Sequence, residues 1–289
     1  MTQRMTTGIE WLDSHLGGGV ISGTMTLILG ATGIGKSHLG ISFAHQGKKE
    51  DGTPGIIFDM LSRGDSQNHQ NYAKSLFDWP LESYQPIDLK ELWDKSNLGH
   101  YFQVFEEQGK KVHRSQLTDE DWHRWQVKIQ SQVQKIGQFF YAHFIRGVKR
   151  VVVDGVEPVT DTSESAQHEL FEYLYHKVIQ SEDEWLAREV LRQDYRSHSP
   201  LVHEHPYDSK EITTVFLQTT EETMIHDLIA RKAYMGGLEA NANTIILMGR
   251  VIEGDQIGRR LYIAKHRGSY ASDQLIPFEI TGSGLVETP

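Results

Sequence analysis

Cysteine is absent from this chain of 289 residues, which excludes disulfide bonds and metal sites built from thiolates. No stretch approaches the roughly 18 apolar residues of a membrane-spanning helix. The opening residues, MTQRMTTGIEWLD, lack the apolar core of a secretion signal. Positive charge is in deficit, with 29 Lys and Arg against 39 Asp and Glu. We therefore expect a cytoplasmic protein that does not interact with membranes.

The net charge of −10 also bears on nucleic acids. An acidic protein repels a phosphate backbone, so DNA binding is not favoured and would need a local basic groove or one formed by oligomerisation. With 38% hydrophobic and 24% charged residues, the composition is that of an ordinary globular protein able to bury a core.

Short apolar runs of β character predict an α/β fold. The early runs are separated by long polar or amphipathic stretches, which indicates βαβ units and a mostly parallel sheet flanked by helices. The late runs are close together with glycine-containing turns, which indicates a C-terminal antiparallel hairpin. The expected strands are 24–29, 55–60, 150–155, 213–219, 243–252, 259–265 and 275–280.

Two helices are expected from apolar residues at helical spacing, at 121–145 and at 164–180. The aromatic residues of the first, including Trp122 and Phe139, are interpreted as core. Two further stretches, about 86–120 and about 182–210, have the character of insertions, and either could be a protein-partner surface or a mobile loop. The histidines at 198, 203 and 205 do not complete a metal-ligand pattern, so a solvated loop is expected over 197–208.

The strongest motif is GATGIGKS, residues 30–37, which fits the phosphate-binding loop G-x-x-x-x-G-K-[ST] in full. Glycines let successive N–H groups point at phosphates, and a helix N-terminus adds a favourable dipole. Lys36 is expected to contact the β- and γ-phosphates, and the Ser37 hydroxyl to coordinate Mg²⁺. The residues expected to bind ATP are Thr32, Gly33, Ile34, Gly35, Lys36, Ser37 and His38.

Besides the Ser37 hydroxyl, a phosphate-binding loop of this kind needs a carboxylate at the end of a neighbouring strand to hold the metal. The run RVVVDG offers Asp154 at the end of an apolar strand, so Asp154 is expected to join Ser37 in holding the metal. The alternative for an aspartate in this position is a turn or cap signal.

Four blocks in the right order give a resemblance that spans nearly the whole chain. They are TTGIEWLDSHLGGGVISG (6–23), GATGIGKS, RVVVDG and LYIAKHRGSYASDQLIPFEITGSGLV (261–286), with YAKSLFDWPL (72–81) also similar. Together they resemble the KaiC family of RecA-like ATPases. The first block also resembles the bacterial RadA repair proteins, which share this core.

The resemblance implies a single RecA-like domain over 1–289 that assembles into a ring, commonly a hexamer, with ATP between protomers. It also implies that Lys265 and Arg267, from the family's K-x-R-G phrase, reach the γ-phosphate bound by the neighbouring subunit. Residues two apart on a strand share a face, so both cations could meet one phosphate. The alternative is an exposed basic edge strand that discourages aggregation.

One departure from the family pattern concerns catalysis. The family places catalytic glutamates just after its second strand, where this chain has FDMLS, with Leu61 and Ser62 at the two positions. Neither side chain offers a carboxylate to orient water. Asp59 could substitute through a small register shift, whereas Asp65 is too far along. Gly155 also replaces a serine common in the family.

The sequence thus favours a KaiC-like protein that binds ATP and Mg²⁺, hydrolyses ATP slowly or not at all, and acts as a regulatory or assembly switch. With ATP the KaiC-like protein is expected to form a ring or filament of its own copies. The alternative is a RadA- or RecA-type recombination or repair ATPase that assembles on DNA. The segment 218–237 lies where RecA-type recombinases carry a DNA-binding loop, but its charges are balanced, so it is interpreted as an interprotomer segment. A P-loop kinase is a third, weaker alternative.

Overall fold

The computed structural model describes residues 3–60, 67–93, 98–104, 118–156, 166–231 and 238–289. No helix within these ranges is long and apolar enough to cross a lipid bilayer.

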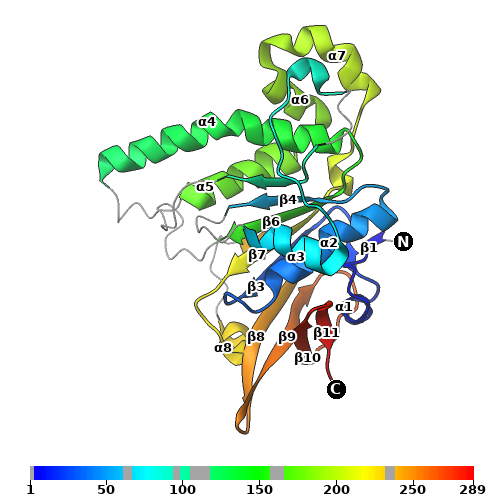
Figure 1. Ribbon diagram of the computed structural model, residues 1–289, viewed down its shortest axis with the longest axis vertical. Helices are drawn as coiled ribbons and strands as arrows, with labels where there is room; N and C mark the ends of the chain where they lie inside the picture. Colours follow the sequence, from blue (N-terminus) through cyan, green and yellow to red (C-terminus); the bar gives the residue numbers. More distant parts are fainter. Residues whose placement is uncertain (1–2, 61–66, 94–97, 105–117, 157–165, 232–237) are drawn as a thin grey trace.

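A sheet of nine strands runs through the centre of the described structure (Figure 1), in the order β11-β10-β9-β8-β3-β7-β6-β4-β5. The strands from β8 to β5 in this order are parallel, and β9, β10 and β11 continue the sheet in antiparallel fashion. The strands are β3 (Met25–Gly30), β4 (Ile56–Asp59), β5 (Tyr101–Gln103), β6 (Arg150–Val156), β7 (Thr213–Thr219), β8 (Thr244–Glu253), β9 (Gln256–His266), β10 (Ile276–Thr281) and β11 (Gly284–Glu287). The α/β fold with a mostly parallel sheet and a C-terminal antiparallel part is confirmed.

The helices cover both faces of the sheet because its central strands are apolar on both sides. Leu27 and Leu29 of β3 face one core cluster, and Ile28 faces the other. The second cluster is covered by α1 (Glu10–His15), α2 (Lys36–Glu50) and α3 (Gln67–Phe77), and the first by α4 (Asp119–Phe144), α5 (Ala166–Tyr173), a π-helical turn (Leu174–Ile179), α6 (Asp183–Leu191), α7 (Tyr195–Glu204) and α8 (Ile225–Ala230). Two short strands, β1 (Arg4–Met5) and β2 (Val20–Ile21), form a separate ribbon, and α9 (Leu238–Asn241) precedes β8. Trp122 and Phe139 of α4 are buried, so their interpretation as core is confirmed.

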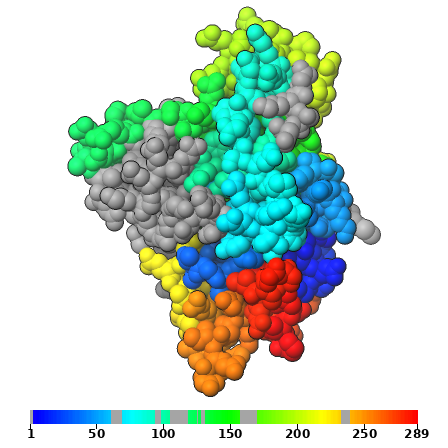
Figure 2. Space-filling model, viewed as in Figure 1, coloured from blue at the N-terminus to red at the C-terminus, as the bar shows by residue number. Residues whose placement is uncertain are grey.

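The C-terminal strands lie beside the helices of the second cluster. Figure 2 shows β10 and β11, in red, next to α2 and α3 on one face of the molecule. The side chain of Leu285 on β11 approaches Gly35 at the start of α2 so closely that an added Cβ there would lie 3.0 Å from it. The end of the chain therefore packs against the beginning of α2.

The expectation of a solvated loop over 197–208 is wrong for the residues up to Glu204. These residues belong to α7, which is helical despite Pro200. Val202 is buried in the core, and the ring of His198 stacks on Trp93 with centroids 5.2 Å apart. Among the described residues, no group of three or more histidines and carboxylates is arranged to hold a metal ion. The segment 182–210 thus contains helices α6 and α7, which lie at the end of the molecule opposite the β8–β9 hairpin (Figure 1).

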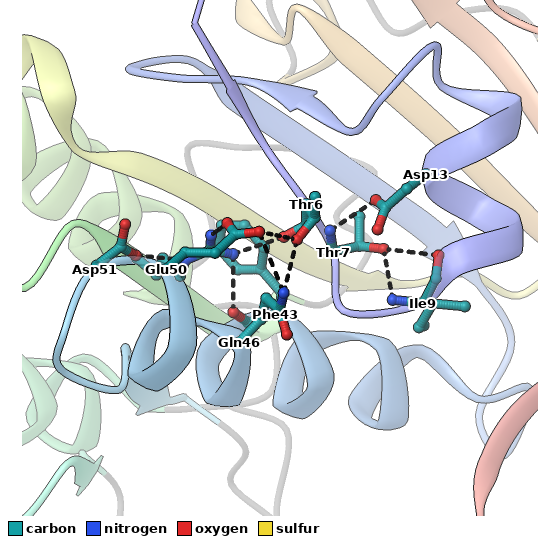
Figure 3. A network of polar contacts seen from close by, with 9 residues as sticks. Thr6, Thr7, Ile9, Asp13, Phe43, Gln46, Glu50 and Asp51 are labelled. Carbon is teal, nitrogen blue, oxygen red and sulfur yellow. Dashed lines mark hydrogen bonds and ion pairs between the residues drawn. The ribbon is translucent and has the colours of Figure 1, made fainter.

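A polar network joins the N-terminal segment to α2 and β6 (Figure 3). Arg150, the first residue of β6, is fully buried. Its guanidinium donates to the carboxylates of Glu50 and Asp51, with Nε 2.6 Å from Asp51 Oδ2, and to the carbonyl oxygen of Thr6 at 2.6 Å. Gly55 leaves room for this side chain, because an added Cβ there would lie 2.7 Å from Arg150 Cβ. The N-terminal segment is therefore held at the amino-terminal end of β6, the end of the parallel strands opposite the phosphate-binding loop.

Asp13 in the same region gives a pH-dependent stability. Its Oδ1 accepts a hydrogen bond from the Thr7 backbone N–H at 2.7 Å, yet burial raises its pKa to about 6. A raised folded-state pKa means that the ionised form is disfavoured in the folded protein, so stability is lost as pH rises from about 4 to 6. We expect Asp13→Asn, which keeps the acceptor, to raise the free energy of unfolding at pH 7.5 by about 2 kcal/mol.

Urea denaturation of both proteins at pH 7.5 and pH 4.5 measures this difference. The gain should shrink at the lower pH, where the wild-type carboxyl is neutral in the folded state. A variant that is less stable than the wild type at pH 7.5 would contradict the account.

Candidate functional site

The phosphate-binding loop connects the end of β3 to the start of α2 at the carboxyl edge of the parallel strands. Gly33 and Gly35 have φ angles of +77° and +114°, a region that L side chains rarely adopt. Gly30 is required for a different reason, because an added Cβ would lie 2.3 Å from the carbonyl oxygen of Met248. The loop therefore has the backbone that the motif predicts, with the N-terminus of a 15-residue helix directly behind it.

Lys36 is folded back over this loop. Its Nζ donates to the carbonyl oxygens of Gly30 at 2.9 Å and Ala31 at 3.0 Å, and the residue is buried. Burial lowers the pKa of Lys36 to about 8, while the nearby charge of Asp154 acts in the opposite direction. The ammonium thus lies within the loop with two weak carbonyl partners that an anion could replace.

Asp154 ends the apolar part of β6 and lies opposite Ser37. Its Oδ2 accepts a hydrogen bond from Ser37 Oγ at 2.8 Å, and its Oδ1 accepts one from the Gly155 N–H at 2.7 Å. A hydroxyl and a carboxylate in contact form the all-oxygen donor set that Mg²⁺ prefers. The residues present therefore fit a magnesium ion, with Ser37 and Asp154 as those that would hold it.

His69 of α3 lies in the same site and was not identified from the sequence. Its Nε2 is 2.8 Å from Asp154 Oδ2, and its Nδ1 is 3.5 Å from Asp59 Oδ2. Burial alone would lower the pKa of His69, but the hydrogen bond and charge of Asp154 and the charge of Asp59 raise it above its ordinary value. Burial alone would raise the pKa of Asp154. The hydrogen bond and charge of His69 nevertheless hold the Asp154 pKa below its ordinary value. The two side chains are therefore joined by a hydrogen bond in which the imidazole donates to the carboxylate.

Asp59 is the last residue of β4 and is paired in register with Asp154 on β6. It is completely buried, and its Oδ2 accepts a hydrogen bond from the Tyr101 hydroxyl at 2.5 Å. In this structure its carboxylate contacts protein groups in the interior. Leu61, Ser62 and Asp65, the other positions considered for a catalytic carboxylate, lie outside the described residues.

Lys265 and Arg267 lie towards the amino-terminal end of the parallel strands, whereas the loop lies at their carboxyl end. Lys265 is paired with Ile245 of β8, which is paired with Leu27 of β3, three residues before Gly30. By strand geometry, the backbone of Lys265 is roughly 10 Å along the strands and roughly 10 Å across the sheet from Gly30. These two cations are therefore remote from the phosphate-binding loop of their own chain.

The two cations nevertheless lie close to each other. Arg267 is one residue beyond the end of β9, so the two are not both on the strand as expected. Lys265 Nζ donates to the Glu239 carbonyl oxygen at 2.8 Å, and Arg267 Nη2 to that of Ala240 at 3.4 Å. Burial and the charge of Arg267 lower the pKa of Lys265. Both groups thus rest on carbonyl oxygens of α9, at one place on the surface.

The remaining residues expected to bind nucleotide lie along the loop and the first turn of α2. Thr32 is exposed and Ile34 is buried. His38 is half-buried, its ring centroid lies 4.4 Å from that of Tyr72 on α3, and burial lowers its pKa. His38 thus links the first turn of α2 to α3, the helix that carries His69.

Comparison with known proteins shows the family of this chain. The chain is 25% identical over 285 residues to the circadian clock oscillator protein KaiC of Picosynechococcus sp., a match that covers 98% of this chain and 44% of that protein. It thus spans about half the length of that relative. It is also 26% identical over 294 residues to a UPF0273 protein of Aeropyrum pernix, covering 100% of this chain and 95% of that one.

Among solved structures, a KaiC-like protein from the hyperthermophilic archaeon Pyrococcus horikoshii superposes with a TM-score of 0.58 at 18% identity, covering both chains completely. That likeness confirms the expected fold. The family model for the KaiC ATPase matches residues 5–183, which include the phosphate-binding loop, Asp59, His69 and Asp154. The chain belongs to the KaiC family of ATPase domains.

Proposed function

We propose that this protein binds ATP together with Mg²⁺ at the phosphate-binding loop and uses nucleotide occupancy as a regulatory or assembly switch. The observation that carries the proposal is the contact between Ser37 and Asp154, 2.8 Å apart beside the N-terminus of α2. A phosphate group at that helix end would meet backbone N–H groups, the helix dipole and the ammonium of Lys36.

Each residue has a distinct role in this proposal. The backbone of Thr32 to Ser37 holds the phosphates through its N–H groups. Lys36 leaves the two carbonyl oxygens that it now contacts and pairs with the β- and γ-phosphates. Ser37 and Asp154 hold Mg²⁺, which when bound neutralises phosphate charge. The surroundings of Asp154 keep it ionised, as a metal ligand must be.

Hydrolysis is proposed to be slow or absent. Attack on the γ-phosphate needs a group that orients water. Asp59 is fully buried and hydrogen-bonded to Tyr101, which does not suit that role. The sequence offers Leu61 and Ser62 at the positions where the family has glutamates. ATP is therefore proposed to stay bound at the loop without being cleaved.

The nucleotide is proposed to lie between two copies of the chain, in a ring such as a hexamer or in a filament. Lys265 and Arg267 support this, because they are remote from their own loop and their contacts are with neutral carbonyl oxygens. Two neighbouring cations that rest on carbonyl oxygens are suited to pair with the γ-phosphate held by an adjacent subunit. ATP occupancy would then favour the assembled form.

Turnover of ATP by the purified protein tests this function. We expect a rate below about 0.01 s⁻¹, some three orders of magnitude under the roughly 10 s⁻¹ of a median enzyme. Binding of ATP with Mg²⁺ should be readily measured in the same preparation by calorimetry. At saturating ATP and Mg²⁺, Asp59→Asn should leave the slow rate unchanged within about twofold, because Asp59 is assigned no role in activating water for attack on the γ-phosphate.

Asp154→Ala serves to exclude a contaminating ATPase. A wild-type rate above about 1 s⁻¹ that Asp154→Ala abolishes would show efficient hydrolysis at this site and would overturn the proposal of a slow switch. Failure of the wild-type protein to bind ATP with Mg²⁺ would overturn the whole proposed function.

A further inference from the structure

The buried centre of the site holds a histidine between two carboxylates. Asp59 and Asp154 are paired in register on adjacent parallel strands, so their side chains leave the ends of β4 and β6 next to each other. Both are buried, with 0% and 3% of their surface exposed. Two adjacent carboxylates in a low-dielectric interior repel each other, and a hydrogen-bond donor placed between them offsets this repulsion. His69 lies there, and it is itself only 2% exposed.

We propose that His69 is a positioning residue for the metal-binding carboxylate: its imidazole holds Asp154 in the orientation that faces Ser37, and Asp59 in turn holds the imidazole. This inference rests on the proposed binding of ATP with Mg²⁺, and it adds a residue that the phosphate-loop motif and the Asp154 strand do not indicate.

The hydrogen bonds on Asp154 support this role. A carboxylate can only accept, so Ser37 Oγ and His69 Nε2 both donate to Oδ2, each at 2.8 Å, and the Gly155 N–H donates to Oδ1. Ser37 is itself proposed as a metal ligand. Among the described residues, the contacts that remain to fix the carboxylate are then those with His69 and Gly155. Of these two, His69 is the one that acts on Oδ2, the oxygen that also contacts Ser37.

The other side of the imidazole explains how His69 keeps its own orientation. Its Nδ1 is buried, makes no hydrogen bond within the described residues, and lies 3.5 Å from Asp59 Oδ2. Asp59 is in turn held by the Tyr101 hydroxyl on β5, and the rings of Tyr101 and His69 lie 5.8 Å apart. A continuous chain of contacts therefore runs from β5 through Asp59, His69 and Asp154 to Ser37.

A matched pair of substitutions separates the two sides of the ring. In His69→Gln the amide nitrogen reaches about as far as Nε2 and can still donate to Asp154. In His69→Asn it reaches only about as far as Nδ1, towards Asp59, and the contact with Asp154 is lost. Both variants are neutral, polar and similar in size, so they differ chiefly in which carboxylate they contact.

The measurement is the ATP affinity of the purified full-length chain by calorimetry, once with Mg²⁺ and once with EDTA. Loss of a group that orients a metal ligand typically weakens metal binding roughly 10- to 100-fold. We therefore expect the ratio of the two affinities to fall at least about tenfold in His69→Asn and to stay within about threefold of the wild type in His69→Gln. The affinity in EDTA should change little in either variant, because the metal-free nucleotide does not depend on Asp154. A merely structural role for His69 would lower both affinities together.

An unchanged ratio in His69→Asn overturns the inference and leaves the proposed function intact, whereas a wild-type protein that binds no ATP overturns both. Tyr101→Phe gives a second test that does not alter the histidine, because it removes the hydroxyl that holds Asp59. The ratio should fall about threefold or more in this variant as well. If His69→Asn does not fold, an unchanged ratio in Tyr101→Phe overturns the inference by itself.

Discussion

Replacing Lys36 with alanine is expected to weaken the binding of ATP with Mg²⁺ by roughly 30- to 1,000-fold, because removing one partner of a buried charge pair costs about 2–4 kcal/mol. The Lys36 ammonium already lies within the loop, 2.9 Å and 3.0 Å from two carbonyl oxygens. Little rearrangement is needed for it to meet phosphate oxygens. Calorimetric titration of both proteins with ATP measures the loss.

Lys48→Ala is the matched control, since Lys48 lies on the same helix α2 but is exposed near its C-terminus. Its removal should leave the ATP affinity within about twofold, because exposed charges are screened at this distance. Equal affinities of Lys36→Ala and the wild type would mean that ATP does not bind at this loop. The far-UV circular dichroism of all three proteins should be the same.

Replacing Arg150 with alanine is expected to lower the free energy of unfolding by about 3–5 kcal/mol, the cost of breaking a buried ion pair by removal of one partner. The Arg150 side chain is completely buried, and its loss leaves Glu50, Asp51 and two carbonyl oxygens without their common donor. It also leaves a cavity beside Phe43, whose ring lies 4.8 Å from the guanidinium carbon. Urea denaturation followed by circular dichroism measures the change.

Two further variants make this prediction specific. Arg150→Lys keeps the charge but not the planar set of donors, so we expect an intermediate loss of about 2 kcal/mol. Arg124→Ala removes an arginine of α4 whose side chain is 69% exposed and paired with Asp121, and it should change stability by no more than about 0.5 kcal/mol. Equal stabilities of Arg150→Ala and Arg124→Ala would contradict a structural role for the buried network.

The parts of the fold that follow local rules could be predicted from the sequence. The apolar runs became strands, and the glycine-rich loop lies between β3 and α2 as its motif requires. Strand β5 could not be predicted, because Tyr101–Gln103 is only three residues long. It is a strand because it pairs with β4 at the edge of the sheet. Helix α7 could not be predicted, because Pro200 and two histidines are untypical of a helix, and the segment is helical although it buries only Val202.

The same distinction applies to the site. Lys36, Ser37 and Asp154 are marked by motifs that describe one strand and the loop after it. His69 has no such mark, because its role comes from α3 lying across the ends of β4 and β6, which is a tertiary relation. Arg150 gives a similar case. An arginine that begins a strand is usually exposed. Its burial is explained by the closeness of Gly55 and of the two carboxylates at the C-terminal end of α2, Glu50 and Asp51.

The most direct test of the central claim is a crystal structure of this protein with Mg²⁺ and an ATP analogue that resists hydrolysis. The account predicts phosphates at the N-terminus of α2 in contact with Lys36, the metal held by Ser37 and Asp154, and Lys265 and Arg267 of a second copy facing the γ-phosphate. A nucleotide bound away from the loop would contradict the claim. So would one bound at the loop in an isolated monomer, with no cation from another copy near its γ-phosphate.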